Sequence, residues 1–403
     1  MPMRPLSCLF PTLPVRAACR GAAAACLLAA AGAAPAVTPA AGPVQGVPAW
    51  NARLAAELPR IAQQHRAGVG VYVRDLGTQE TAHYQSDESW YLASTVKVPV
   101  AIAVLRAVER GEYKLDTGVK LQASDYVDGA GLTNRYPVGT SLTIRYLIDQ
   151  MIVHSDNTAS DMLIGLVGVD EVNAVVASLV PTGFGRITTL AEVRRLAYGN
   201  LIPAARRLSG RQLILLNRQR SDTERMDMLS RFTGTPVTQF KLPSLEEAYA
   251  AYYASGLNSG RLDAYGELLA QLARGMALGP AQTDYLLKVM QRVETGQHRI
   301  KAGLPAGVAF AHKTGTQRRR FCDAGIAQAP GAGATVAPQR VVIVACTRGD
   351  LSLERSETAL REVGSAICRS GLLTHGVIDA PSCPPVALPA AGRVPAAGAA
   401  APS

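Results

Sequence analysis

Aromatic side chains are scarce in this sequence and make up 5% of its 403 residues. Its 41 lysines and arginines outnumber its 31 acidic residues, which gives a formal charge of +10 at pH 7. A charge of this sign is compatible with a polyanionic partner. However, no nucleic-acid-binding motif is present, and few aromatic residues are available on which bases would stack. We therefore expect no nucleic-acid binding and, at most, affinity for anionic polymers of the cell envelope.

Metal-binding cysteine patterns are also missing. None of the seven cysteines has Cys-x-x-Cys spacing or a histidine at zinc-ligand spacing, so we expect no metal site, and no cofactor is expected. Three cysteines lie within the first 26 residues, which leaves Cys322, Cys346, Cys368 and Cys383. An even number in an oxidising compartment predicts at least one disulfide, although four cysteines allow three sets of pairs. A strand hairpin would place Cys322 opposite Cys346, which leaves Cys368 for Cys383.

No apolar run outside the N-terminal leader reaches the length of a membrane-spanning helix, so we expect no stable membrane insertion. Residues 1–20 contain three arginines and no acid, and a run of small apolar residues then leads to Ala34-Pro-Ala36. This is the pattern of a secretory signal with an Ala-x-Ala cleavage site. We therefore assign residues 1–36 to a signal peptide and 37–48 to a linker. We expect an exported monomer, periplasmic or secreted.

Apolar periodicity predicts strands near both ends of the chain and helices between them. The predicted strands cover 68–75, 81–84, 308–312, 322–329 and 340–346. This order indicates an α/β (α+β) protein with one sheet assembled from both chain ends, flanking helices and an inserted all-helical lobe. The expected boundaries are 49–93 with 305–373 for the α/β lobe, 94–304 for the helical lobe and 374–403 for a disordered tail.

A serine and a lysine three residues apart open the first apolar helix after the predicted hairpin. In Tyr91-Leu-Ala-Ser94-Thr-Val-Lys97, Ser94 is expected at the N-cap, with Lys97 one turn away on the same face. A buried lysine loses its proton near neutral pH because desolvation disfavours the ammonium form. It can then act as the base that activates a serine nucleophile. An ordinary N-cap serine beside a surface lysine would have the same spacing.

Two further motifs follow. Ser155-Asp-Asn157 comes after a helix-like segment, and Lys313-Thr-Gly315 comes after a strand-like one. Ser-x-x-Lys, Ser-Asp-Asn and Lys-Thr-Gly in this order are the signature of class A β-lactamases and penicillin-binding proteins, which the chain resembles over about residues 50–373. The resemblance implies the β-lactamase-like architecture, in which the sheet is antiparallel and the active site lies where the two lobes meet.

The residues of these motifs predict acyl transfer. Ser94 would attack a carbonyl group, and neutral Lys97 would take its proton directly or through a water. The resemblance implies that Ser155 relays a proton to the leaving nitrogen and that Lys313 tunes the electrostatic potential around it. It also implies an oxyanion hole formed by the backbone N–H groups of Ser94 and Thr316. The substrate-binding residues implied in this way are Asn157 for an amide side chain, and Thr314, Gly315 and Thr316 for a carboxylate, with charge from Arg318, Arg319 or Arg320.

The step that would free the serine requires a base that activates a water. Class A β-lactamases use a glutamate to activate a water, and an asparagine a few residues later helps to position it. In the matching region Glu192 is near the expected place, but position 196 is leucine, so the Glu-x-x-x-Asn pairing is missing. Thr189-Leu-Ala-Glu192 also matches a helix capping box, in which the glutamate bonds to the backbone. Glu192 is thus a candidate base and a candidate cap, and the sequence favours the cap.

Residues 200–258 are longer than the connection that the resemblance implies here. Their helical spacing predicts added helices rather than disorder, and six arginines lie between positions 206 and 225. These arginines would either gather an acidic substrate or form a solvated helix face, and the second interpretation is favoured.

Several functions fit these residues. The leading hypothesis is a serine hydrolase that cleaves β-lactams through a Ser94 acyl-enzyme. A sensor that β-lactams acylate and that turns over little would carry the same motifs, as would a peptidoglycan D,D-peptidase or esterase. A Ser-His-Asp hydrolase is disfavoured because no Gly-x-Ser-x-Gly motif is present, and we expect His154 and His312 only to line the cleft. The expected partner is therefore a β-lactam or a peptidoglycan-derived molecule.

Overall fold

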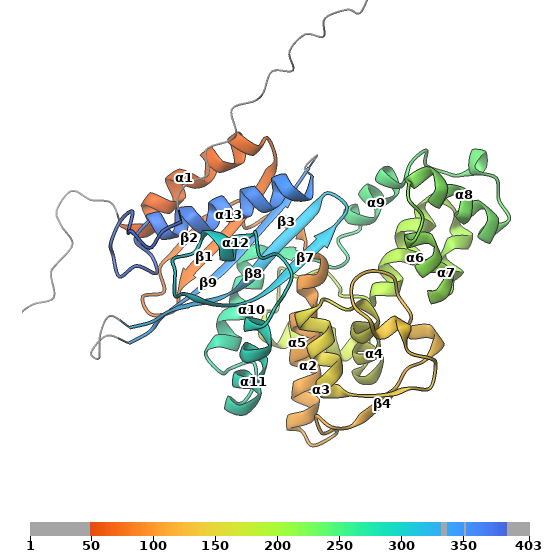
Figure 1. Ribbon diagram of the computed structural model, residues 1–403, viewed down its shortest axis with the longest axis horizontal. Coiled ribbons are helices and arrows are strands. Elements are labelled where there is room, and N and C mark those ends of the chain that lie inside the picture. The colour runs from red at the N-terminus through yellow and green to blue at the C-terminus, as the bar shows by residue number, and fades with distance from the viewer. Residues whose placement is uncertain (1–48, 332–336, 350–351, 385–403) are drawn as a thin grey trace, which may run out of the picture. The chain divides into compact units, whose positions relative to one another are not determined.

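A five-stranded antiparallel sheet joins the two ends of the chain. The computed structural model describes residues 49–331, 337–349 and 352–384. The strand order is β2-β1-β9-β8-β7, and β1 pairs along its whole length with β9, from Gly68 opposite Arg348 to Asp75 opposite Val341 (Figure 1). The strands are β1 (Gly68–Asp75), β2 (Thr81–Tyr84), β7 (Ala309–Gln317), β8 (Arg320–Ala329) and β9 (Gln339–Arg348). The predicted α/β fold, with a sheet built from both chain ends, is confirmed.

Both faces of this sheet are covered, which explains the continuous apolar run of β9. Alternate residues of a strand point to opposite faces. Val341 and Ile343 pack in one core with α1 (Trp50–His65) and α13 (Leu353–Arg369), whereas Val342 and Val344 pack in the core shared with the helical lobe. Helix α10 (Leu262–Ala273) lies on this second face, although the sequence assigned it to the helical lobe alone.

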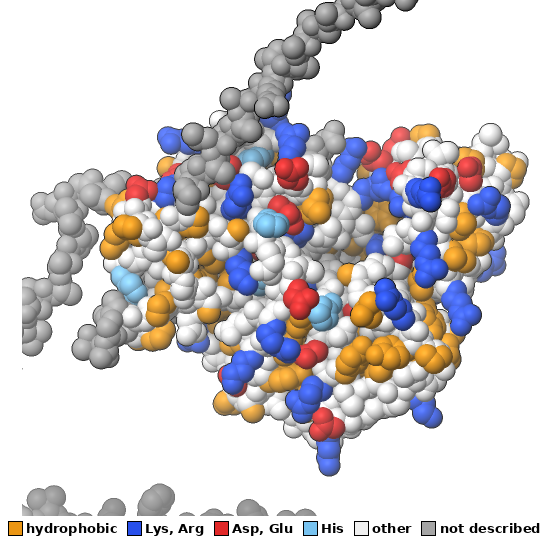
Figure 2. Space-filling model, viewed as in Figure 1, with side chains coloured by type: hydrophobic (Ala, Val, Ile, Leu, Met, Phe, Trp, Pro, Cys, Tyr) orange, Lys and Arg blue, Asp and Glu red, His pale blue; other side chains and the backbone are white. Residues whose placement is uncertain are grey.

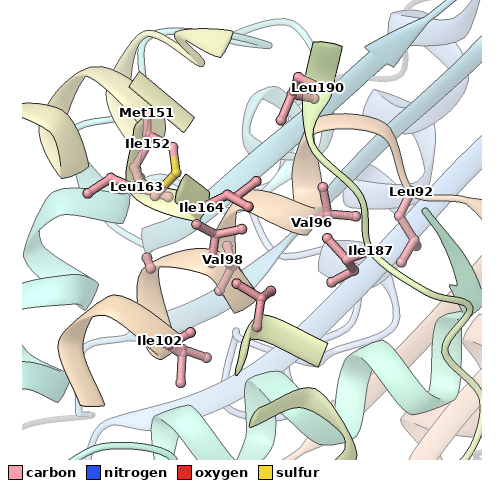
Figure 3. Close-up of a cluster of buried hydrophobic side chains, with 14 of the residues drawn as sticks. Leu92, Val96, Val98, Ile102, Met151, Ile152, Leu163, Ile164, Ile187 and Leu190 are labelled. Atoms are coloured by element: carbon pink, nitrogen blue, oxygen red, sulfur yellow. The ribbon is translucent and has the colours of Figure 1, made fainter. Parts of the chain in front are cut away.

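Helix α2 (Lys97–Glu109) is the centre of the helical lobe. Its residues from Val98 to Leu105 are all buried, so the helix is apolar on every side, as expected for a helix enclosed by others (Figure 3). The surrounding helices are α3 (Ile144–Val153), α4 (Asn157–Val167), α5 (Val169–Leu179) and α11 (Pro280–Gln291), whereas the short α12 (Ile300–Gly303) packs against α13. Short strand pairs complete the lobe: β3 (Ser89–Tyr91) with β6 (Ser259–Arg261), and β4 (Gly118–Lys120) with β5 (Ser141–Thr143).

The segment 200–258 contains the added helices that its spacing predicts. They follow α6 (Leu190–Leu201) and are α7 (Gly210–Asn217), α8 (Asp222–Thr233) and α9 (Leu245–Ala254), with 3-10 turns at Pro203–Arg207 and Val237–Gln239. Each begins at a serine whose hydroxyl accepts a backbone N–H of the first turn, namely Ser209, Ser221 and Ser244. Together α6 to α9 form one side of the molecule (Figure 1).

The C-terminal segment corrects one prediction and confirms another. Residues 374–384, expected to belong to a disordered tail, form turns that return to the body, where the backbone N–H of Ala306 donates to the Ser382 carbonyl. Disulfides join Cys322 to Cys346 and Cys368 to Cys383, so the predicted pairs are confirmed. The predicted signal peptide and linker lie outside the described residues.

Within the described ranges, no single helix has both the length and the apolar composition to cross a membrane. The pair α4 and α5 meets that test only when joined, and it is bent by 85°.

Candidate active site

Ser94 lies in a 3-10 turn, Ala93–Val96, between β3 and α2. It is therefore not the N-cap of α2, which begins at Lys97. Tertiary contacts fix the turn: the Tyr265 hydroxyl donates to the Thr95 carbonyl at 2.7 Å, and Ala93 has a left-handed φ of 48°. Such a φ is uncommon for a residue with a side chain and costs about 1–3 kcal/mol, which the surrounding structure must offset. Ser94 itself is half-buried, whereas the residues on either side of it are buried.

Lys97 is fully buried and points across the cleft to the Ser-Asp-Asn turn. Its Nζ donates to the Ser155 carbonyl at 2.6 Å, to Ser155 Oγ at 3.2 Å and to Asn157 Oδ1 at 2.7 Å. Burial lowers the pKa of Lys97 to about 7, although the negative charges of Asp156 and Asp161 oppose the shift. This shift favours the neutral amine, the form that can accept a proton, far more than in a lysine exposed to water.

The Ser155 turn is held from several sides. Ser155 has a left-handed φ of 59°, and Asp156 caps α4 by accepting the Ala159 N–H at 2.9 Å. The second carboxylate oxygen of Asp156 accepts the Thr133 N–H at 2.8 Å. The side-chain amide of Asn157 donates to the Asp128 carbonyl at 2.6 Å. These bonds fix the hydroxyl of Ser155 beside Lys97.

Strand β7 brings the Lys-Thr-Gly motif next to the serine turn. A Cβ at Gly315 would lie 2.5 Å from the Leu92 carbonyl oxygen, so only glycine permits this approach. Lys313 is fully buried, and burial together with the charges of Lys97 and Arg299 holds its pKa well below the usual range. The Thr314 and Thr295 hydroxyls lie 2.5 Å apart. All three predicted motifs thus meet around Ser94.

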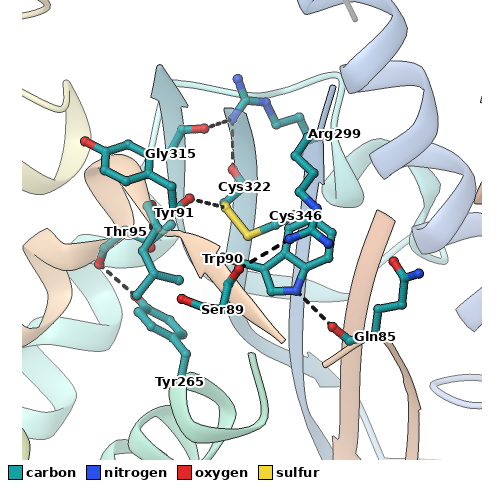
Figure 4. Close-up of a disulfide and its surroundings, with 12 residues drawn as sticks. Gln85, Ser89, Trp90, Tyr91, Thr95, Tyr265, Arg299, Gly315, Cys322 and Cys346 are labelled. Atoms are coloured by element: carbon teal, nitrogen blue, oxygen red, sulfur yellow. Dashed lines mark hydrogen bonds between the residues drawn. A yellow bond between two sulfur atoms is a disulfide. The ribbon is translucent and has the colours of Figure 1, made fainter. Parts of the chain in front are cut away.

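Arg299, which the sequence analysis did not single out, lies next to the end of β7, and its Nε donates to Glu357 at 3.2 Å. It is buried, and its guanidinium donates to the Gly315 carbonyl at 3.0 Å and the Cys322 carbonyl at 2.9 Å (Figure 4). It also donates to Thr316 Oγ1 at 2.7 Å. It precedes the short helix α12 and belongs to no motif, so no local signal identified it. Behind it, the Cys322–Cys346 disulfide joins β8 to β9, and Cys322 Sγ lies 3.5 Å from the Tyr91 carbonyl oxygen.

The three consecutive arginines after the motif have other partners. Both terminal nitrogens of Arg318 donate to Asp222 at 2.7 Å. Arg319 pairs with Glu246, and Arg320 lies 4.6 Å from the centre of the Tyr253 ring. All three arginines therefore have partners other than the predicted substrate carboxylate.

Glu192 lies in the first turn of α6, and among the described residues no hydrogen bond joins its carboxylate to Ser94, Lys97 or Ser155. Its N–H donates to Thr189 Oγ1 at 3.1 Å, whereas the return bond that would complete a capping box is absent from the described hydrogen bonds. The buried carboxylate of Asp161 instead accepts the N–H groups of Leu190, at 2.7 Å, and Ala191, at 2.9 Å. Leu190 packs into the central core, and Glu192, two residues later, is on roughly the opposite side of the helix.

Neither histidine lies against Ser94. His154 is partly exposed and lies 3.1 Å from Glu294. His312 is fully buried, with its Nδ1 2.7 Å from Asp323 and its ring stacked on Phe310. Because His312 alternates with Lys313 along β7, it faces the other side of the sheet. The expectation that His312 lines the cleft is therefore wrong.

A model of the "Beta-lactamase enzyme family" matches residues 53–370. The chain belongs to the β-lactamase enzyme family. Its chemistry is therefore that of a serine hydrolase, and Ser94 is the serine that the three motifs surround.

Individual members of the β-lactamase family are distant from this chain. β-Lactamase VEB-1 of Pseudomonas aeruginosa is 20% identical over 265 residues, which cover 65% of this chain and 71% of that protein. Among solved structures, a PBP-A variant in an acyl-enzyme complex with penicillin G has a TM-score of 0.59 at 19% identity and covers 80% of this chain and 98% of its own. A variant of the TLA-1 extended-spectrum β-lactamase has a TM-score of 0.60 at 19% identity, with coverage of 79% and 98%. At these identities the structural likeness shows the fold.

Proposed function

We propose that the protein is acylated on Ser94 by β-lactams and hydrolyses the acyl-enzyme slowly. The observation that carries this proposal is the buried Lys97 amine, with its pKa near 7, held by Ser155 and Asn157 one turn from Ser94. Membership of the β-lactamase family supports β-lactams as the substrate class.

In the acylation step, the Ser94 oxygen bonds to the lactam carbonyl carbon as neutral Lys97 takes the hydroxyl proton, directly or through a water. Backbone N–H groups of Ser94 and Thr316 stabilise the oxyanion, and each such donor contributes about 2.7–4 kcal/mol in the transition state. The carbon–nitrogen bond of the ring then breaks. Ser155, bonded to Lys97, passes a proton to the leaving nitrogen.

Positive charge and hydroxyl groups at the end of β7 suit the carboxylate of the substrate. Thr316 is bonded to Arg299, and Thr314 lies beside it on the strand. Across the cleft, Asn157 is placed to hold an amide side chain, with its own amide nitrogen near the Asp128 carbonyl.

Deacylation is proposed to be slow because no suitable base adjoins the serine. In the described part of the chain, no carboxylate is hydrogen-bonded to Ser94, Lys97 or Ser155, and Glu192 lies on the far side of α6 from Leu190. Lys97 is then the group left to activate a water. This arrangement also suits a D,D-peptidase, and one similar structure is a PBP-A acyl-enzyme complex with penicillin G.

A time course of intact mass with a penicillin tests the proposal. We expect a rapid mass increase on the peptide that contains Ser94, followed by slow loss of the adduct. No adduct is expected in Ser94→Ala, and an adduct that persists in this variant would refute the assignment. Turnover of a chromogenic cephalosporin separates an enzyme from a sensor, and release of D-Ala from a peptide ending in D-Ala-D-Ala separates a peptidase from a lactamase.

We further propose that the protein is exported and acts as a monomer in the periplasm or outside the cell. The arginine-containing leader and the Ala34-Pro-Ala36 site support export. N-terminal sequencing of secreted protein tests this, since an intact leader on the mature protein would contradict it.

A further inference from the structure

A polar cavity of about 240 Å³ adjoins the catalytic residues on the side of the added helices. It lies between α6, α8, α9 and the end of β7. Asp128, whose carbonyl accepts from Asn157, is part of its lining, as is Gln317, which directly follows Thr316. Asp128 thus links the lining of the cavity to Asn157, the residue that is expected to hold the amide side chain of the substrate.

The cavity presents hydrogen-bond donors without partners of their own. Arg194 uses Nε to bond both carboxylate oxygens of Asp128, at 2.7 and 3.0 Å. Among the described residues, no hydrogen bond from its two terminal nitrogens is present, nor one from the hydroxyls of Tyr198 and Tyr249, which line the same cavity. Two parallel N–H groups of one guanidinium match the two oxygens of a carboxylate.

Positive charge exceeds negative charge around this space. Three arginines, Arg194, Arg225 and Arg318, line the cavity, and their acidic partners are Asp128 and Asp222, of which Asp222 is shared by two of them. Several Lys and Arg side chains are visible over the region of α6 to α9 (Figure 2). One cation is thus left over, and a single anionic group would balance it.

The segment 200–258 builds one wall of this cavity. It supplies Asn217 from α7, Arg225 from α8, and Leu245 and Tyr249 from α9. The Arg318 guanidinium lies 5.6 Å from the centre of the Tyr249 ring, which ties α9 to the end of β7. The added segment therefore forms much of the lining of this cavity, together with residues of α6 and the end of β7.

We propose that this cavity is a subsite for a carboxylate carried on the acyl portion of the substrate, with Arg194 as its main ligand. We assign the acyl portion of the substrate to this cavity for two reasons. Asp128, which lines the cavity, is hydrogen-bonded to Asn157, the residue expected to hold the amide of the acyl side chain. Gln317, which also lines the cavity, points to the opposite face of β7 from Thr316, and it is Thr316 that is bonded to Arg299. The proposal rests on acylation of Ser94, as proposed above, and adds the substrate class: acyl donors with an acidic side chain.

Two penicillins that differ only at the end of a flexible aliphatic side chain, carboxylate or carboxamide, test the proposal. The measurement is the second-order rate constant for the Ser94 adduct by intact mass. We expect the carboxylate to react about ten- to a hundredfold faster, which is the range expected for a charge-assisted hydrogen bond. Arg194→Gln should lose most of this preference.

Arg231→Gln is the matched control, because Arg231 is an exposed arginine on α8 outside the cavity, and it should keep the preference. If Arg194→Gln fails to fold, Arg225→Gln serves as the second variant. Asp222 would still be paired with Arg318 in this variant, so we expect it to fold and to lose part of the preference for the carboxylate. Equal rates for the two penicillins in the parent protein, or a preference that survives substitution of Arg194, would overturn the proposal.

Binding of both penicillins to Ser94→Ala by calorimetry separates this proposal from the function on which it rests. If Ser94→Ala binds the carboxylate penicillin more tightly but the parent protein forms no Ser94 adduct, the subsite is supported and the proposed acylation is refuted. If Ser94 is acylated at the same rate by both penicillins, the proposed acylation is supported and the subsite is refuted.

Discussion

The state of one amine controls the nucleophile. Lys97 is fully buried, and the loss of hydration is the main cause that lowers its pKa far below that of a lysine in water. The neighbouring carboxylates of Asp156 and Asp161 favour the ammonium form and limit the shift. The result is a lysine that changes its protonation state within the physiological pH range.

The rate of acylation should therefore follow the neutral form of Lys97. Because its pKa is lowered to about 7, the rate constant should rise about tenfold per pH unit below 7 and level off above about pH 8. Stopped-flow measurement of adduct formation from pH 5 to 9 tests this. A rate that still rises towards pH 10 would show that the lysine keeps its ordinary pKa.

Glu192 offers a second test at the scale of one residue. Because it lies on the far side of α6 from Leu190, Glu192→Gln should leave the rate of adduct loss nearly unchanged. Because its side chain makes no capping bond among the described hydrogen bonds, the free energy of unfolding should fall only by the ~0.3–1 kcal/mol of a lost negative charge in the first turn. If the variant instead traps the acyl-enzyme while folding normally, Glu192 is the base and the protein is an ordinary class A enzyme.

Among the elements, α6 connects the nucleophile to the added helices. Asp161 on α4 holds its first two N–H groups, and Arg194 and Tyr198 on the same helix reach the donor-lined cavity. Burial raises the pKa of Asp161 to about 7, although the two N–H groups oppose this shift. One carboxylate thus fixes the position of a whole helix beside the active site.

Asp161→Ala should loosen the start of α6. Two buried N–H groups would lose their acceptor, and an unsatisfied buried group costs about 1–3 kcal/mol. We expect a lower free energy of unfolding in urea and faster hydrogen exchange at Leu190 and Ala191. Asp161→Asn, which keeps one acceptor oxygen, should lose less, and Asp227→Asn on the exposed side of α8 should lose almost nothing. Equal exchange rates in Asp161→Ala and the parent would contradict this role.

The sequence predicted those elements whose pattern is local. Strand alternation located β1, β2 and the core of β7 to β9, and three short motifs located the residues that meet at Ser94. Arg299 was missed because it is an isolated arginine that only tertiary folding brings to Thr316. Asp161 could have been predicted to lie near the site, since it is four residues after Asn157 and therefore on the same face of α4. The prediction that one of the arginines at 318–320 binds a substrate carboxylate did not foresee the partners of Arg318 and Arg319. These partners, Asp222 and Glu246, lie far away in sequence.

At the scale of the whole molecule, covalent bonds secure the C-terminal part. Cys368 and Cys383 are separated by 15 residues, and a loop of this length is expected to contribute about 3 kcal/mol by restricting the unfolded chain. Cys368→Ala with Cys383→Ala should lower the free energy of unfolding by about this amount, measured by urea denaturation without reductant. Ser94 should still be acylated at 25 °C, because neither cysteine adjoins it. An unchanged denaturation midpoint would show that the bridge does not form in the protein.

The pairing of β1 with β9 has a consequence for the order in which the molecule is made. On a ribosome, β1 emerges long before β9, the strand that pairs with its second edge, because Gly68 pairs with Arg348. Until then β1 and β2 can form only a two-stranded hairpin, which is marginally stable in water. We expect the sheet to form after synthesis, so that truncation before β9 yields a protease-sensitive chain whatever happens in the helical lobe.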